Sequence, residues 1–163
     1  MTKKIVPREI IQSKIFIIRE KKVMLDKDLA LLYGIKPIRL REQVKRNLKR
    51  FPSDFMFQLT ENEVDVMVSH FAIPSRKHLG GHLPYAFTEQ GVLMLSSVLN
   101  SEKAIQINIQ IMRAFNKLRE LMIEHRDLRE KAVPSFIPYP TQTTFTSFSI
   151  NLKSLSAVIT SPL

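Results

Sequence analysis

Two short apolar runs joined by a charged turn lie near the start of the chain. In the stretch "KIFIIREKKVML", residues 14–25, these runs are Ile15 to Ile18 and Val23 to Leu25. Runs of this length around a charged turn are typical of a β-hairpin. The next stretch, "DKDLALLYG", carries apolar residues at helical intervals between Asp26, which suits an N-cap, and Gly34, which suits a left-handed C-cap. We therefore expect a hairpin followed by a short helix.

A second helix is predicted directly after this glycine. Pro37 suits the first helical position, and Pro52 forbids continuation beyond Phe51, so the helix is expected over residues 37–51. At about 100° per residue, the apolar side chains form one stripe and the charged ones lie opposite. The predicted stripe consists of Leu40, Val44, Leu48 and Phe51.

The pattern then changes to a period of two residues. The stretch "DFMFQL" alternates Phe55, Phe57 and Leu59 on one side, which predicts a half-buried strand. Thr60 and Glu63 have the spacing of a capping box, and apolar residues follow at helical intervals. A third helix is therefore expected after Thr60.

A segment with two prolines and two glycines separates this helix from the next elements. The stretch "PSRKHLGGHLP", residues 74–84, predicts a mobile loop or a hairpin tip, and "YAF" after it suits a short strand. Thr88 is a suitable cap for a helix over residues 89–99, and Ser101 is suited to open another.

The last predicted helix covers residues 102–131. The stretch "AIQINIQI" alternates like a strand, but the apolar spacing then becomes three and four, and no turn residue interrupts it. The apolar surface is wide, so it either completes the core or pairs with a second copy of the chain. We expect Ile105 to Phe115 in the core and propose a dimer surface further along, with the candidates Leu118, Leu121, Met122 and Leu128.

These elements predict an α+β domain over residues 1–131. It contains a small N-terminal β-hairpin, a pair of helices resembling a helix–turn–helix, short strands and a long C-terminal helix. From Val133 onward there is no acidic residue, and Ser, Thr or Pro occupies fifteen of 31 positions. We therefore interpret residues 132–163 as a poorly ordered tail.

Charge is concentrated in the second predicted helix. The chain has 25 basic and 15 acidic residues, a net charge of +10, which points toward nucleic acid or an anionic membrane surface. Within residues 36–50 seven side chains are basic, and Glu42 is the only acidic one. A solvated helix face is the simpler alternative, but such faces usually alternate in sign. A basic second helix after a glycine turn favours insertion into a DNA major groove.

Side chains of this helix and of the glycine loop are assigned to two kinds of DNA contact. Arginine, glutamine and glutamate can read base edges in the major groove, whereas other cations neutralise phosphates. The loop could form a wing on the DNA, or it could be an ordinary exposed loop. The base-reading candidates are Arg39, Glu42, Gln43 and Arg46, and the phosphate candidates are Arg41, Lys45, Lys49, Arg50, Arg76 and Lys77.

Several classes of site find little support in the sequence. The absence of cysteine excludes disulfides, thiol catalysis and cysteine-based zinc sites. Only four histidines are present, and no glycine-rich phosphate loop or activated nucleophile is seen, so we expect no enzyme, no cofactor and no metal. No apolar run could span a bilayer, and no secretion signal is seen, so we expect a cytoplasmic protein.

Several blocks together resemble a known family. They are "VMLDKDLALLYGI", "VKRNLKRFPSDFMFQLTENE", "LPYAFTEQGVLMLSSVLNSEKAI" and "IQIMRAFNKLRE". This chain resembles, over about residues 14–120, the DNA-binding domain of phage and prophage regulators related to KilA-N and Bro-N, of the open-reading-frame-six N-terminal type. The residues of the basic helix that carry the resemblance are Val44, Arg46, Asn47, Arg50, Phe51 and Pro52.

The resemblance implies a small α+β domain, a mobile-element or bacterial origin, and DNA binding, often with antirepression. Two features depart from it: Lys36 stands at the N-cap where Thr or Ser is expected, and the tail lacks a charged helical continuation.

We accordingly expect a sequence-selective double-stranded DNA-binding regulator or antirepressor in the bacterial nucleoid. One alternative is a module that binds a repressor protein through the long helix without DNA. A metal-dependent nuclease is the third hypothesis. A homodimer is compatible with the first two.

Overall fold

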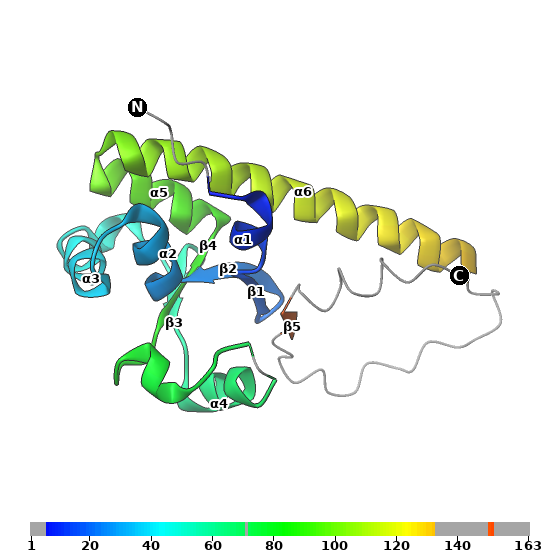
Figure 1. Cartoon of the computed structure of the whole chain (residues 1–163), viewed down its shortest axis with the longest axis horizontal. Coiled ribbons are helices and arrows are strands. Elements are labelled where there is room, and N and C mark those ends of the chain that lie inside the picture. Colours follow the sequence, from blue (N-terminus) through cyan, green and yellow to red (C-terminus); the bar gives the residue numbers. More distant parts are fainter. Residues whose placement is uncertain (1–5, 71, 133–149, 152–163) are drawn as a thin grey trace.

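The computed structural model describes residues 6–70, 72–132 and 150–151 (Figure 1). It confirms the α+β class. In chain order the elements are α1 Arg8–Gln12, β1 Ile15–Ile18, β2 Lys21–Leu25, α2 Asp26–Tyr33, α3 Pro37–Arg46, the 3₁₀ helix η1 Leu48–Arg50, β3 Met56–Gln58, α4 Glu61–Ser69, the 3₁₀ helix η2 Arg76–Leu79, β4 Tyr85–Thr88, α5 Glu89–Leu99, α6 Glu102–Ala132 and β5 Ile150–Asn151.

The strands form one antiparallel sheet in the order β3-β4-β2-β1-β5. The predicted hairpin is confirmed as β1 and β2, and its two turn residues, Arg19 and Glu20, both have positive φ angles of 52° and 62°. The Arg19 Nε lies 2.7 Å from Glu63 Oε1 on α4, and its guanidinium carbon lies 4.4 Å from the centre of the Phe57 ring. These contacts tie the hairpin turn to β3 and α4.

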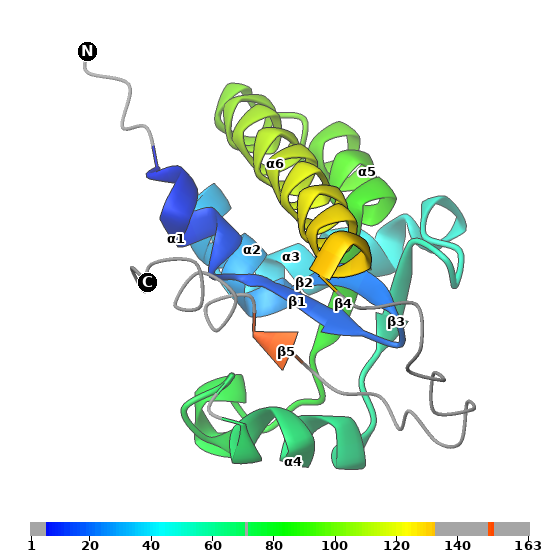
Figure 2. The ribbon, with the colours of Figure 1, turned by 90° about the vertical axis from the view of Figure 1, so that its right-hand side faces the viewer.

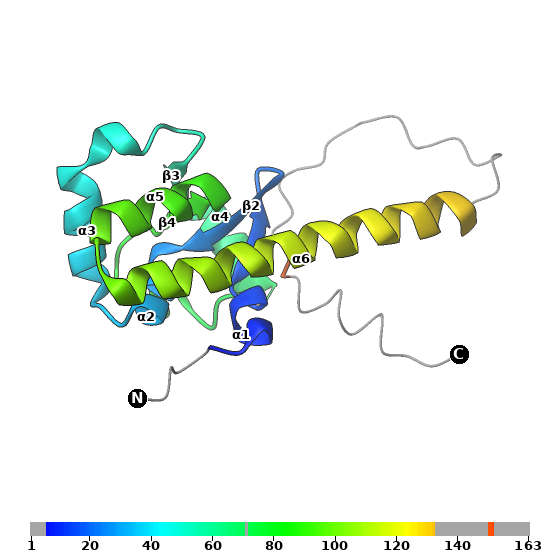
Figure 3. The same ribbon diagram turned by 90° about the horizontal axis from the view of Figure 1, so that it is seen from above.

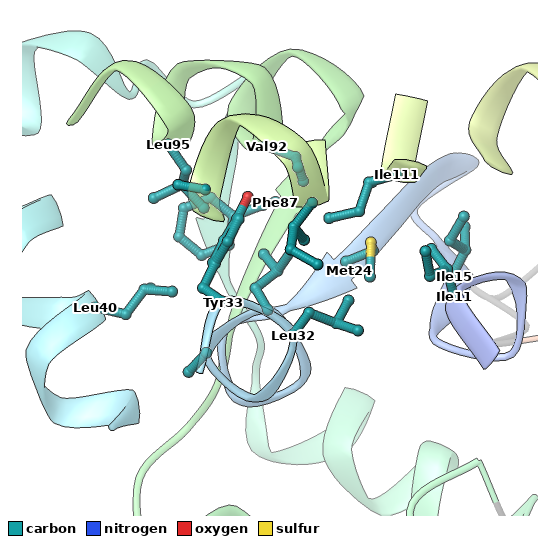
Figure 4. Packing of buried hydrophobic residues seen from close by; sticks show 14 of the residues in the cluster. Ile11, Ile15, Met24, Leu32, Tyr33, Leu40, Phe87, Val92, Leu95 and Ile111 are labelled. Atoms are coloured by element: carbon teal, nitrogen blue, oxygen red, sulfur yellow. The ribbon is translucent and has the colours of Figure 1, made fainter. Parts of the chain in front are cut away.

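Helices cover both faces of this sheet (Figure 2). Ile15, Met24 and Phe87 face α1, α2, α3, α5 and α6 in one core cluster, while their strand neighbours Phe16 and Val23 face α4 and η2 in a second. Because both faces are buried, β1 and β2 read as continuous apolar runs instead of alternating ones. Figure 4 shows the first cluster around Tyr33, Phe87 and Leu95.

The same two-sided burial corrects the predicted alternation in the strand after Pro52. As expected, Leu59 is buried in the second cluster and Phe57 packs half-buried against it, but Met56, between them in alternation, is buried in the first cluster on the other face. A strand with cores on both sides has no single apolar face, so period two alone does not identify the buried side chains.

Two predicted helix boundaries are wrong. Asp26 is not the N-cap but the first residue of α2, after Leu25. The second helix ends at Arg46 instead of continuing to Phe51, because Asn47 leaves helical geometry at φ −124° and its side-chain amide donates to the Gln43 carbonyl at 2.8 Å. In consequence Leu48 is 56% exposed, although we expected it in the buried stripe.

The other helix ends agree with expectation. Gly34 is left-handed at φ +70°, and Thr60 and Glu63 form the capping box. Thr88 accepts a hydrogen bond from the Gly91 amide at the start of α5, and Ser101 accepts one from the Ala104 amide in α6. The glycine loop contains the 3₁₀ turn η2, and both of its glycines have positive φ.

The long predicted helix is confirmed as α6, which extends beyond the rest of the fold at its C-terminal end (Figure 3). Ile107, Ile111 and Phe115 are in the core as expected, but Ile105 and Ile109 are 45% and 41% exposed. Ile105 and Ile109 each lie two residues before a buried isoleucine, so they are on the other side of the helix from Ile107 and Ile111.

A buried polar link joins α6 to α2 and α5. The Tyr33 hydroxyl donates to Asn108 Oδ1, and the Asn108 amide donates to the Val92 carbonyl at 2.9 Å. Burial raises the pKa of Tyr33 well above its ordinary value, so the phenol stays protonated as a donor. This link fixes α2, the first helix of the predicted pair, against the long helix.

The predicted tail, residues 132–163, falls outside the described residues except for Ala132, Ile150 and Asn151. Ile150 and Asn151 form β5, which pairs with Ile17 and Phe16 of β1 at the edge of the sheet. The division of the chain into a domain and a tail therefore stays a prediction.

The close approach of α5 to the segment after η1 leads to a stability prediction. A Cβ at Gly91 would lie 2.1 Å from the carbonyl oxygen of Phe55, which also accepts the Thr88 amide at 3.0 Å. Gly91→Ala is expected to lower the free energy of unfolding by about 1–3 kcal/mol, although alanine normally favours a helix. Urea unfolding of the full chain measures this.

Gln90→Ala, at an exposed neighbouring position of α5, is the control and should change stability by less than about 0.5 kcal/mol. A Gly91→Ala protein as stable as the wild type would show that the two segments are not in close contact.

Candidate nucleic-acid interface

The predicted pair of helices is present as α2 and α3, joined by the turn at Gly34 to Lys36. Lys36 is the N-cap of α3 and makes no side-chain cap, and Pro37 is at the start of the helix, as expected. The Lys103 ammonium lies against Gly34, since a Cβ there would be 2.1 Å from the Lys103 Nζ. The turn therefore carries cationic charge from Lys36 and from α6.

α3 packs by one side only, at the end of the molecule opposite the projecting end of α6 (Figures 1 and 3). Leu40 and Val44 are 0% and 3% exposed and lie in the core cluster that includes α5. Phe51, after η1, is 5% exposed and meets the Phe87 ring edge-on at 5.9 Å between centroids. The opposite side of α3 and η1 faces solvent.

A buried ion pair sets the position of α3 against α2. The Asp26 carboxylate is 0% exposed; one oxygen accepts the Arg41 Nε at 2.6 Å, and the other accepts the Lys27 amide at 2.8 Å. The Arg41 side chain is itself only 17% exposed. Arg41, a predicted phosphate contact, is therefore engaged within the fold.

Five cations of residues 36–50 have no ion-pair partner in the described structure, and we call them the basic face: Lys36, Lys45, Arg46, Lys49 and Arg50. Of the seven cations, Arg41 is paired with Asp26 and Arg39 is paired with Glu42 at 3.3 Å. That leaves five, all on exposed residues and none with a carboxylate partner among the residues that the structure describes.

The predicted base-reading residues differ in how they are presented. The Arg39 side chain is 73% exposed and that of Glu42 is 43% exposed, and Arg46 is exposed. Gln43 is half-buried, and its carbonyl is engaged by Asn47. Arg39, Glu42 and Arg46 thus share the outer side of α3, and Gln43 lies at its margin.

The predicted phosphate contacts are divided between two places. Lys45 is on α3 and Lys49 is on η1, both exposed, and Arg50 on η1 donates to the Ser97 hydroxyl of α5 at 3.2 Å. Because η1 departs from the α-helix, Lys49 and Arg50 do not continue the helical face of α3 but flank it beside α5.

The glycine loop lies in the other layer of the fold. Leu79 of η2 belongs to the core cluster with α4, on the opposite face of the sheet from α3. Arg76 is paired with Asp65 and Glu61 of α4. Its hydrogen bond with Asp65 has the largest effect on the guanidinium and the bond with Glu61 the next largest, and both raise its pKa. Lys77 is exposed. The structure does not bring Arg76 and Lys77 together with the basic face.

A small cavity of about 200 Å³ lies between α2 and η2. Its lining includes Asp28, Lys14 and His78, and the Asp28 carboxylate lies 3.3 Å from the Lys14 ammonium. Burial raises the pKa of Asp28, while the Lys14 ammonium opposes this effect. In the described part of the chain, no three His, Asp or Glu side chains gather where they could hold a metal ion.

The proposed dimer surface on α6 is partly taken up by the core. Leu118 is 5% exposed and belongs to the first cluster, so it is not available to a partner. Leu121 is half-buried, whereas Met122 and Ile123 are 41% and 52% exposed. The side chain of Leu128 falls outside the described residues. Within the described chain, no helix is long and apolar enough to cross a membrane.

Sequence reasoning missed two residues of this region. It treated Asp26 as a cap, although its main partner is Arg41, fifteen residues away and not identifiable from local spacing. It also passed over Ile38, which is 60% exposed on α3. The helical position of Ile38, opposite the Leu40 and Val44 stripe, is the signal that could have found it.

Comparison with known proteins identifies one family. The model of the ORF6N domain matches residues 13–98, which include both helices of the pair, η1 and most of α5. No curated protein matches the chain, and neither does any solved structure.

The buried ion pair predicts very different outcomes for two arginines of one helix. Arg41→Ala removes the cationic partner of the fully buried Asp26 carboxylate, so we expect a loss of about 3–5 kcal/mol in the free energy of unfolding. Arg39→Ala removes only an exposed pair with Glu42 and should cost at most about 1 kcal/mol. Urea unfolding of both variants measures the difference, and equal losses would refute a structural role for Arg41.

Proposed function

The chain belongs to the ORF6N domain family, a phage-associated family of the KilA-N and Bro-N type, and on that premise we propose that it binds double-stranded DNA sequence-selectively. In this proposal α3 enters the major groove, and the protein acts as a transcriptional regulator or antirepressor in the bacterial nucleoid. The family is of a regulatory type without catalysis.

The basic face is the observation that carries this proposal. Lys45 and Lys49 are like charges four residues apart, and Arg46 and Arg50 have the same spacing. Lys49 and Arg50 lie on η1, beyond the end of α3, so the cations cluster across both segments, and no carboxylate among the described residues pairs with them. A row of phosphates would neutralise these cations with release of counterions, which favours binding.

The exposed side of α3 also carries side chains that can recognise bases in the major groove. An α-helix fits the major groove of B-form DNA, and side chains on the inserted face of such a helix reach base edges. Arg39 and Arg46 can each donate two hydrogen bonds to a guanine, and Glu42 can accept from a cytosine amino group. In this arrangement Lys45, Lys49 and Arg50 contact the DNA phosphates. Arg41 contacts no DNA and instead pairs with Asp26.

Two variants separate phosphate contact from base reading. Lys49→Ala should lower the affinity for every duplex on the order of tenfold near 0.1 M salt and should reduce the salt slope by about one. Arg46→Ala should instead narrow the difference in affinity between a duplex selected from a random pool and a scrambled one. Fluorescence anisotropy of the full chain at several salt concentrations measures both.

Lys21→Ala is the matched control, because Lys21 is an exposed lysine at the start of β2 with no ion pair in the described structure. It should leave affinity and slope unchanged. Equal losses for Lys21→Ala and Lys49→Ala would mean that binding reflects total charge alone. If no duplex binds at low salt, the proposed function is wrong.

The projecting end of α6 favours a second candidate function, a protein-interaction module that pairs chains or engages a repressor. Met122 and Ile123 are both exposed there. Since this end is far from α3, a partner on it would leave the basic face open (Figure 3).

This second candidate predicts an oligomer that depends on α6. The wild-type chain should be dimeric at tens of micromolar in light-scattering measurements, and Met122→Glu with Ile123→Glu should make it monomeric. Ile109→Glu, at a similarly exposed position of α6 within the folded body, is the control and should leave the mass unchanged. A monomeric wild type would argue against self-pairing.

A further inference from the structure

Ile38 is an apolar side chain on an otherwise charged surface. It is the second residue of α3 and is 60% exposed, whereas Leu40, two positions later, is 0% exposed. At about 100° per residue, Ile38, Glu42 and Lys45 lie within about 60° of one another on the outer side of the helix. Ile38 thus stands in line with the polar side chains proposed to face DNA.

The fold gives Ile38 no packing role that would account for an isoleucine. It belongs to neither core cluster, nor to the half-buried side chains that pack against them. A β-branched residue is also less favourable in a helix than the lysine, arginine or glutamate found at the other exposed positions of α3. Single exposed apolar residues are common, so the argument depends on where this one lies.

On the premise of the proposed function, we propose that Ile38 is a specificity-determining residue that packs against the 5-methyl group of a thymine in the major groove. Thymine is the one standard DNA base that presents a methyl group there, and apolar side chains recognise it. Ile38 is in the first turn of α3, the part of a recognition helix that reaches base edges.

Glu42 is positioned to contact a second base pair beside the one contacted by Ile38. Glu42 is one turn after Ile38 on the same side of α3; its side chain is 43% exposed, and one of its carboxylate oxygens pairs with the exposed Arg39. A carboxylate accepts from the cytosine amino group and repels phosphates, so it belongs over a base pair and not over the backbone. Ile38 and Glu42 would therefore read neighbouring base pairs, one thymine-containing and one cytosine-containing.

The test uses the full chain and a duplex selected from a random pool, with each thymine replaced in turn by deoxyuridine, which lacks only the methyl group. At one position, the replacement should weaken wild-type binding by about fourfold, the contribution of one buried methyl group. Ile38→Ala should bind the thymine duplex about as weakly as the wild type binds the uracil duplex. Replacing that thymine by uracil should not weaken the binding of Ile38→Ala any further.

Leu31→Ala is the matched control. Leu31 is an even more exposed apolar residue, at 72%, but lies on α2 and not on the outer side of α3, so this variant should keep the full thymine-to-uracil effect. Thermal unfolding should be nearly unchanged in both variants because both side chains are exposed.

The outcomes separate this inference from the proposed function. If duplexes bind with steep salt dependence but no thymine position distinguishes wild type from Ile38→Ala, methyl reading is overturned and DNA binding stands. Methyl reading is also overturned, with DNA binding left standing, if Ile38→Ala weakens the binding of thymine and uracil duplexes equally. If no duplex binds at all, both proposals fail.

Discussion

The ion pair between Asp26 and Arg41 is the interaction on which the presentation of α3 depends. A carboxylate with no exposure to water is tolerable only with a close cation and a further donor, and here Arg41 and the Lys27 amide fill those roles. The pair joins the first turn of α2 to the middle of α3. It therefore keeps Leu40 and Val44 facing the core and the remaining cations facing outward.

The sheet beneath provides a rigid support for this arrangement. Its two buried faces are packed by separate clusters, and the Tyr33 to Asn108 hydrogen bond fastens α2 to α6. The segment after η1 is held by Thr88, whose amide and hydroxyl both donate to the Phe55 carbonyl. Since the Asp26 to Arg41 pair holds α3 and Thr88 holds the segment after η1, the charged side chains are presented from a fixed backbone, as the proposed duplex recognition requires.

Local sequence signals predicted much of this fold, and tertiary contacts account for what they missed. The hairpin, the capping box at Thr60 and the glycine C-cap all depend on neighbouring residues, and all are confirmed. The break at Asn47 and the partner of Asp26 depend on side-chain bonds that spacing does not reveal. The basic helix was evident from sequence, but only the structure separates Arg41 from the cations that face solvent.

The most direct test of the account is a map of the residues that a duplex touches. Amide chemical shifts of the isotope-labelled full chain would be followed during titration with a selected duplex and compared with a scrambled one. The account predicts that the largest changes lie within residues 36–50, with little change in α4 and η2. Large changes confined to α4 and η2, or to the exposed end of α6, would contradict it.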